Sequence, residues 1–257
     1  MISLLTDPHF YLVGIPAVIL VGLSKGGFGG AMALLGVPLL ALVVSPVQAA
    51  AILLPVLIVM DIVSLWTWRG FIDKRLIAIM LPGAFVGIVI GWLTAAVVTA
   101  DHVRLIVGII TFLFFLRWAI GKLRRDQRAS RHNPPKGFFW GTVSGFTSFV
   151  AHAGGPPFQI YALPLRHDPK IYTGTSVIFF AVVNAVKVIP YFALGQFDTT
   201  NLAASAILMP FAPLATLAGA WIVKRMRPEI FYPFMYIMIL IVSLKLIHDG
   251  VTGLWGW

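Results

Sequence analysis

The chain contains no cysteine among its 257 residues, which excludes both a disulfide framework and a thiolate metal site. Charge is also scarce: charged residues make up 11% of the sequence, and 9 acidic residues stand against 19 lysines and arginines. No polar stretch is longer than the connection over residues 122–136, so no soluble module is expected. The sequence also lacks H-E-x-x-H, Walker and dinucleotide-binding motifs, and we predict no cofactor and no metal ligand.

Apolar residues dominate the sequence. Hydrophobic residues make up 59% of the chain and mean hydropathy is +0.93, whereas soluble domains are about 45–50% apolar. We therefore predict an integral membrane protein whose surroundings are a lipid bilayer. The net charge of +10 comes from basic residues in short loops beside apolar runs, which predicts orientation in the membrane rather than nucleic-acid binding.

The apolar residues fall into eight runs. Six are unbroken and have about the 17–25 residues of a spanning helix: residues 49–68, 76–98, 103–120, 171–194, 202–223 and 230–247. The other two, residues 10–44 and 137–165, are each interrupted by a glycine-rich stretch. The arms of the first, residues 10–23 and 31–44, are shorter than a span and predict a re-entrant hairpin. If each broken run instead crossed the membrane twice, it would also begin and end on the same side of the membrane. This alternative is left open.

Loop charge predicts the orientation. Lysines and arginines concentrate in the loops around residues 69–75, 117–136, 166–170 and 224–227, which places these loops in the cytoplasm. The turns at residues 101–104 and 196–201 carry few basic residues and fall on the other side. Both termini then lie on the non-cytoplasmic side of a bacterial inner membrane. Tryptophans near the expected helix ends, Trp68 among them, predict an interfacial aromatic belt.

Each half of the chain is one broken run followed by three spans. Because three is odd, the halves have opposite orientation, which predicts an all-α polytopic membrane protein with two inverted-topology repeats. Residues 1–121 form the first repeat, residues 122–136 a basic cytoplasmic connection, and residues 137–257 the second repeat. Asp61 and Asn184 fall at equivalent positions. Inverted repeats with broken segments are typical of secondary transporters that bind substrate near the midplane and work by alternating access.

The two breaks have distinctive sequences. The first is GLSKGGFGGAMALLGVP at residues 22–38, followed by Ser45-Pro46, and its echo is Ala153-Gly154-Gly155-Pro156-Pro157. Over nearly the whole chain this pattern resembles the TauE/SafE or sulfite exporter family. The resemblance implies a permease for small sulfur-containing anions such as sulfite or an organosulfonate. The direction of transport, the coupling ion and assembly into a homodimer are left open.

Lys25 is the strongest candidate ligand, because a charged side chain within an apolar segment costs about 3 kcal/mol unless it meets protein, water or an anion. An interfacial anchor is the alternative. Glycines let backbone amides approach a ligand, and half-helices beginning at residues 31 and 157 would direct positive N-termini inward. We expect both breaks to meet near mid-membrane. The predicted substrate-binding residues are Ser24, Lys25, Gly26, Gly27, Gly29, His152, Gly154, Gly155, Gln159, Asn184 and Lys187.

Asp61 and Lys187 lie deep in the runs 49–68 and 171–194. They could form a charge pair or a relay, or Asp61 could pair with Lys25 and leave Lys187 as a second anion ligand. His152 could donate to an oxyanion, carry a proton, or simply be hydrogen-bonded. Asp61 and His152 are the predicted coupling residues.

Two other functions were weighed. Residues 22–26 satisfy G-x-S-x-G, so Ser24 and His152 could form the dyad of an intramembrane serine protease. That motif lacks its strand-turn-helix context and does not explain the second break, so an enzyme is not predicted. A passive anion channel shares every feature of a transporter, and only kinetics would separate the two.

Overall fold

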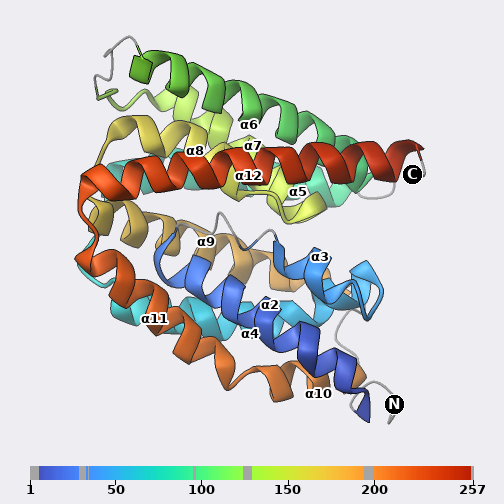
Figure 1. The fold of residues 1–257 in the computed structure, drawn as a ribbon. Coiled ribbons are helices and arrows are strands. Elements are labelled where there is room, and N and C mark those ends of the chain that lie inside the picture. Colours follow the sequence, from blue (N-terminus) through green and yellow to red (C-terminus); the bar gives the residue numbers. More distant parts are fainter. Residues whose placement is uncertain are drawn as a thin grey trace. The chain divides into compact units, whose positions relative to one another are not determined.

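The protein is helical throughout the part of the chain that the computed structural model describes, residues 6–28, 33, 35–94, 97–123, 129–193 and 199–255. Its elements, shown in Figure 1, are α2 (Pro8–Gly27), α3 (Gly36–Leu40), α4 (Pro46–Thr67), α5 (Lys74–Leu93), α6 (Ala100–Leu123), α7 (Pro134–Ala151), α8 (Gly155–Ala162), the 3-10 turn η2 (Leu163–Leu165), α9 (Pro169–Ala193), α10 (Thr199–Leu208), α11 (Phe211–Arg225) and α12 (Pro228–Trp255). Gly29, the expected second-arm start at residue 31 and residues 124–128 of the basic connection lie outside the described residues.

The all-α membrane architecture is confirmed. Six described helices are long and apolar enough to cross a membrane, or up to seven if a bent pair counts as one span. Five of them, α4, α5, α6, α9 and α12, match predicted unbroken runs. Large apolar side chains such as Ile106 and Leu113 on α6 are exposed, as lipid-facing residues would be.

Helix starts follow local sequence rules. Side-chain oxygens of Asp7, Ser45, Asp73 and Asn133 accept hydrogen bonds from backbone amides in the first turns of α2, α4, α5 and α7. Proline also opens α2, α4 and α7, where its missing N–H would have no helical partner. The sequence therefore sets these boundaries locally.

The predicted run 202–223 is not one straight helix. It divides into α10 and α11, which are bent by 47° with respect to each other. Pro210 lies at the break, where it supplies no N–H and its ring would clash with a carbonyl one turn earlier. The prediction of an unbroken span was wrong here, because an internal proline was treated as apolar sequence.

The chain forms two compact units. Unit 1 comprises Met1–Phe71 and Ser176–Arg225, and unit 2 comprises Ile72–Thr175 and Met226–Trp257. Each unit combines segments of both predicted halves, so the units do not coincide with residues 1–121 and 137–257. The inverted repeat relates equivalent segments of the two halves of the sequence, and it stays a prediction.

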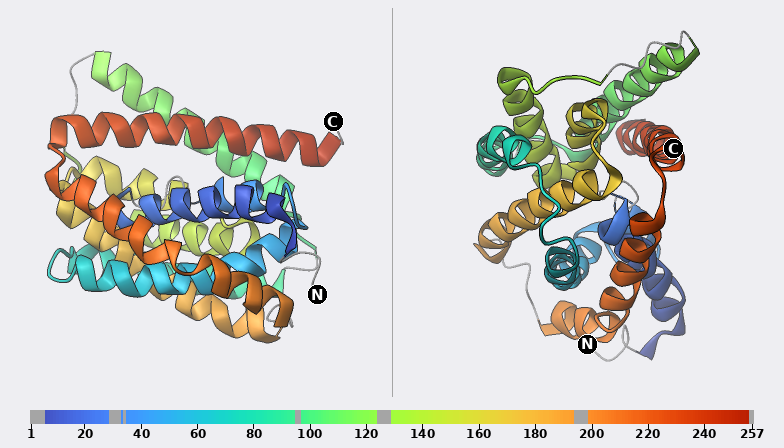
Figure 2. Two further views of the ribbon diagram at one scale, coloured as in Figure 1. Left: turned by 60° about the horizontal axis from the view of Figure 1, so that its bottom comes forward. Right: turned by 90° about the vertical axis from the view of Figure 1, so that its left-hand side faces the viewer.

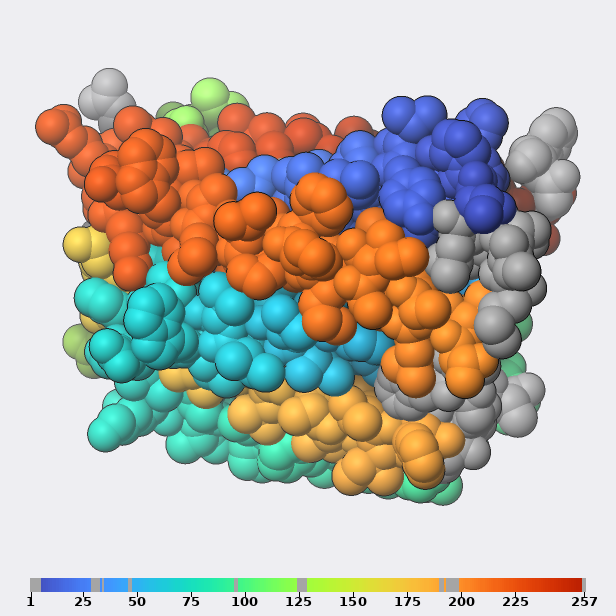
Figure 3. Space-filling model, turned by 90° about the horizontal axis from the view of Figure 1, so that it is seen from below, coloured from blue at the N-terminus to red at the C-terminus, as the bar shows by residue number. Residues whose placement is uncertain are grey.

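In unit 1, α2 packs closely against α11. A Cβ added to Gly26 would lie 1.9 Å from the Thr216 carbonyl oxygen, and one added to Gly27 would lie 2.4 Å from the Gly219 carbonyl oxygen. Figure 3 shows α10 and α11 running along α2 and α4 on one face of the molecule. The glycines therefore let two helix backbones approach each other, as small residues do in membrane proteins.

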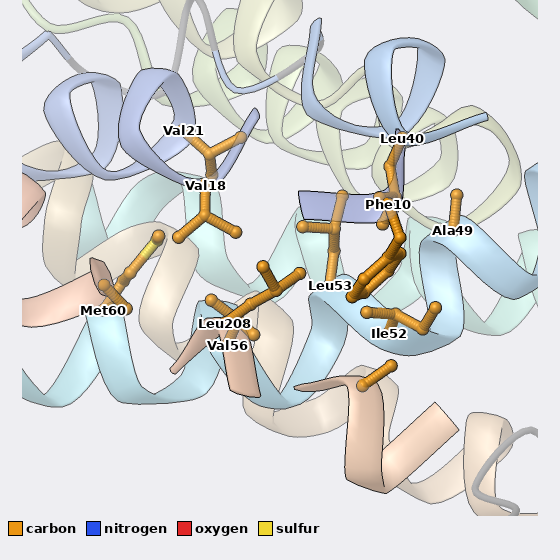
Figure 4. Close-up of a cluster of buried hydrophobic side chains, with 12 residues drawn as sticks. Phe10, Val18, Val21, Leu40, Ala49, Ile52, Leu53, Val56, Met60 and Leu208 are labelled. Atoms are coloured by element: carbon orange, nitrogen blue, oxygen red, sulfur yellow. The ribbon is translucent and has the colours of Figure 1, made fainter. Parts of the chain in front are cut away.

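The first broken run is a hairpin. Gly36 lies against Val21, and Leu40 joins Phe10 and Ile52 in the apolar cluster of Figure 4. The chain therefore reverses after α2 and returns beside it to the start of α4. The first arm is not short, however: α2 has 20 residues and qualifies as a span. The expected end at residue 23 was wrong, because Gly26 and Gly27 are accommodated inside a helix packed on α11.

Unit 2 repeats these features. Gly83 and Gly87 of α5 face backbone atoms of α7, and Gly141 and Gly145 of α7 face backbone atoms of α5. The long helices α6 and α12 also pack together, as Figure 2 shows. The second broken run turns back as well, because Tyr161 near the end of α8 contacts Gly137 near the start of α7.

Candidate functional site

A buried ion pair lies in unit 1. The Lys25 ammonium, on the last turn of α2, contacts Asp61 Oδ1 in the middle of α4. Asn184 of α9 donates from Nδ2 to Asp61 Oδ2 over 2.7 Å. The side chains of Lys25 and Asp61 are each 7% exposed. Of the two pairings that the sequence left open, the structure has Asp61 with Lys25.

Lys187 adds a second positive charge. It is 1% exposed and lies about one turn beyond Asn184 on the same face of α9, and the Asn184 amide contacts Asp61. Lys25, Asp61 and Lys187 are the buried charged side chains among the described residues of unit 1. Two lysines and one aspartate sum to a formal charge of +1. We call Lys25, Asp61, Asn184 and Lys187 the buried charge cluster.

Neighbouring contacts hold Lys25 in place. The Trp68 indole donates from Nε1 to the Gly26 carbonyl oxygen over 2.6 Å, which satisfies a carbonyl that the end of α2 leaves without a helical partner. The carbonyl end of a helix also favours a cation. Trp68 is fully buried, so its assignment to the interfacial belt was wrong. Gly26 and Trp68 are 42 positions apart, and no local pattern joins them.

Gly26 and Gly27 belong to the last turn of α2, where backbone amides point toward the carbonyls of the preceding turn. Their close contacts with α11 explain why glycine is needed at both positions. The binding of an anion by these two amides stays a prediction. The same prediction was made for the Gly29 amide, and Gly29 lies outside the described residues.

Ser24 has a structural contact. Its hydroxyl oxygen accepts a hydrogen bond from the Ala33 amide over 3.1 Å and so ties the returning segment of the hairpin to α2. Ser24 belongs to unit 1 and His152 to unit 2. The Ala33 contact gives Ser24 a role that needs no catalytic dyad.

The second break lies in unit 2, between α7 and α8. His152 ends α7 in the left-handed conformation, with φ at 52°, an arrangement that is uncommon for residues other than glycine. Ser144 Oγ donates to the Gly154 carbonyl oxygen over 2.7 Å, and Thr147 Oγ1 donates to the Ala153 carbonyl oxygen over 3.0 Å. These hydroxyls stabilise backbone groups that the break removes from regular helix. The sequence analysis did not identify Ser144.

The predicted ligands around α8 differ in their surroundings. Gly154 leaves little space, because an added Cβ would lie 2.7 Å from Ser148 Cβ, while Gly155 begins the helix and is buried. Gln159 is 1% exposed, and its Nε2 has no hydrogen-bond partner among the described residues. Tyr172 is the polar side chain that neighbours Gln159, and substrate binding by Gln159 stays a prediction.

Comparison with known proteins agrees with this architecture. No curated protein and no solved structure matches the chain significantly. Residues 14–246, nearly the whole chain, match the family model described as sulfite exporter TauE/SafE. Taken with the apolar helices, that match shows that the chain belongs to the TauE/SafE family of membrane anion transporters.

Proposed function

We propose that this protein is a secondary transporter of a small sulfur-containing anion, sulfite or an organosulfonate, and that the anion binds at the buried charge cluster of unit 1. The observation that carries the proposal is the excess of one positive charge among side chains at most 7% exposed. A net charge buried in a protein is costly, and an anion would neutralise it. Family membership supports the substrate class.

The geometry suggests how binding and release alternate. Without substrate, Lys25 is neutralised by Asp61, and Asn184 holds the carboxylate from its other oxygen. An arriving oxyanion accepts hydrogen bonds from the ammonium groups of Lys25 and Lys187, and Lys25 moves away from Asp61. Binding that favours one conformation shifts the population toward it, which is the basis of alternating access.

Asp61 supplies the coupling step in this scheme. Once Lys25 turns to the anion, the Asp61 carboxylate keeps its hydrogen bond from Asn184. It is the acidic side chain of the cluster to which a coupled proton would bind during transport. Sulfite transport into proteoliposomes should then respond to an imposed pH gradient in the wild type, and Asp61→Asn should remove that response.

A double-variant experiment separates a ligand from a structural partner. Asp61→Asn leaves two buried lysines without a carboxylate, at a cost of about 3–5 kcal/mol, whereas the Lys25→Met/Asp61→Asn double variant leaves one buried lysine. The double variant should therefore melt at a higher temperature than Asp61→Asn. It should nevertheless fail to bind or transport [35S]sulfite, because the anion ligand is missing.

Lys245→Met is the matched control. Lys245 also pairs with an aspartate, at 2.5 Å from Asp249 Oδ1, but on α12 and with its side chain 36% exposed. This variant should transport at the wild-type rate. Wild-type transport by the Lys25→Met/Asp61→Asn protein would show that the pair is purely structural and would overturn the proposed binding site.

Substrate and mechanism are tested together in proteoliposomes. Unlabelled sulfite, sulfate, sulfoacetate and taurine inside the vesicles should differ in how strongly they accelerate entry of labelled sulfite. Such acceleration by substrate on the opposite side requires a carrier that reorients while loaded. Saturation without acceleration, together with current that follows the anion gradient, would favour the passive channel instead.

A further inference from the structure

Three side chains from separate stretches of unit 2 converge on one point. Asp73 precedes α5, His132 precedes α7, and His167 lies between η2 and α9. His167 Nε2 is 2.7 Å and His132 Nε2 is 3.0 Å from the same oxygen, Asp73 Oδ2. The ligand atoms that the three residues offer all lie within 4.8 Å of one another.

The three side chains lie close together, but two of their atoms lack a partner with hydrogen-bond geometry. Asp73 Oδ2 and His167 Nε2 are buried, and neither has a partner with hydrogen-bond geometry among the described residues. The Asp73 side chain as a whole is 10% exposed. Three potential ligand atoms therefore lie close together at a place where the side chains of His132 and His167 are 17% and 24% exposed.

The backbone around the cluster is held by bonds that leave the ligand atoms available. Asp73 uses its other oxygen, Oδ1, to accept from the Leu76 amide at 3.0 Å, and its own amide donates to Thr175 Oγ1 at 2.8 Å. The His167 carbonyl oxygen accepts from the Tyr232 hydroxyl at 2.5 Å. Asn133, next to His132, donates from its backbone N–H to the Tyr161 hydroxyl oxygen at 3.2 Å.

We propose that Asp73, His132 and His167 bind a divalent late first-row transition-metal ion, with Zn²⁺ as the representative ion. Two imidazoles and one carboxylate suit zinc, whereas magnesium and calcium prefer oxygen ligands alone. Ligand atoms around a tetrahedral Zn²⁺ lie about 3.3–3.6 Å apart for bonds of about 2.0–2.2 Å. The observed separations run from 2.7 Å to at most 4.8 Å and so bracket that spacing, and the fourth position is left to water.

The ion would join three connections of unit 2: the segment before α5, the end of the basic connection, and the turn before α9. By the loop-charge rule these connections lie on the cytoplasmic side. The site is separate from the buried charge cluster of unit 1, so its test does not depend on transport.

The test is zinc binding by the full chain in detergent, purified with a histidine-free tag and treated with a chelator. Isothermal titration with ZnCl₂ should give one tight site per chain and a rise in melting temperature, while MgCl₂ should give neither. His132→Gln, His167→Gln and Asp73→Asn should each bind zinc at least tenfold more weakly. Asp73→Asn should keep its fold, because asparagine caps a helix as well as aspartate does.

His248→Gln is the matched control. His248 also lies beside an aspartate, with Nδ1 3.3 Å from Asp249 Oδ1, but its side chain is 72% exposed. It should bind zinc as the wild type does. X-ray absorption at the zinc edge should show nitrogen and oxygen ligands with two imidazoles. Equal zinc affinity in wild type and the three site variants, an equal loss in His248→Gln, or a spectrum without two imidazoles would overturn the proposal.

Discussion

Lys25 shows how a charged side chain is accommodated within apolar helices. Its ammonium has a carboxylate partner, Asp61, and it lies at the carbonyl end of α2, so two electrostatic terms favour the charge. Lys187 is equally buried on α9. Two lysines and one aspartate are buried in this region, and in the proposed function an anion balances the formal excess of one positive charge.

Substitution of Lys187 should separate stability from binding. Lys187→Met removes the excess positive charge and leaves the Lys25–Asp61 pair intact, so the melting temperature without anion should equal or exceed that of the wild type. Sulfite at a hundredfold excess over its Kd should stabilise the wild type by about 2.7 kcal/mol and should have little effect on Lys187→Met. An undiminished sulfite shift in this variant would exclude Lys187 as a ligand.

Ser24→Ala tests the enzymatic alternative. The variant loses the hydrogen bond from the Ala33 amide, which should destabilise the protein by about 0.5–1.5 kcal/mol, and it should keep most of the transport. A fluorophosphonate probe should not label wild-type protein, as measured by intact mass. Labelling at Ser24 that disappears in His152→Ala would favour the protease.

At the scale of elements, the glycine-rich stretch of α2 serves helix packing. The small faces of α2 and α11 meet at Gly22, Gly26 and Gly27, and the pair α5 and α7 meets in the same manner in unit 2. Because lipid tails are as apolar as leucine side chains, association of such helices depends on close backbone approach. The returning arms, α3 and α8, are shorter, with 5 and 8 residues.

Gly26→Ala should therefore loosen the α2–α11 contact. Its added methyl group would meet a backbone oxygen, Thr216 O, at 1.9 Å, and such overpacking should cost about 1–3 kcal/mol. Gly14→Ala on the same helix is the control, since its methyl group would meet side-chain atoms rather than backbone, those of Leu208 at 3.3 Å and Leu40 at 3.6 Å. Thermal unfolding in detergent would contradict this account of the packing if both variants behaved alike.

At the scale of the whole molecule, the prediction concerns topology. With the basic loops in the cytoplasm, a reporter fused after Trp257 should be active only if it works outside the cytoplasm, and a reporter inserted after Ala129 should be active only inside. Paired alkaline phosphatase and green fluorescent protein fusions measure both. The inverted-repeat prediction requires an odd number of membrane crossings in each half of the chain. A cytoplasmic C-terminus would contradict that number for the second half.

The two compact units explain why sequence halves and folded bodies differ. α11, from the second half of the chain, packs on α2 from the first, and α5, from the first half, packs on α7 from the second. Segments exchanged in this way put each broken run beside a helix from the other half. A boundary drawn along the sequence at residues 122–136 therefore does not separate the folded units.

The sequence by itself determined the membrane class, most spans, the helix starts and the family, because these depend on local composition, spacing and motif. It also identified Lys25, Asp61, Asn184 and Lys187 as separate candidates. Only the tertiary structure decided that Asp61 pairs with Lys25, that Trp68 binds the end of α2, and that Asp73 meets two histidines. These contacts join residues 36, 42, 59 and 94 positions apart along the chain. Local periodicity contains no information about such distances, because they are set by which helix faces pack together.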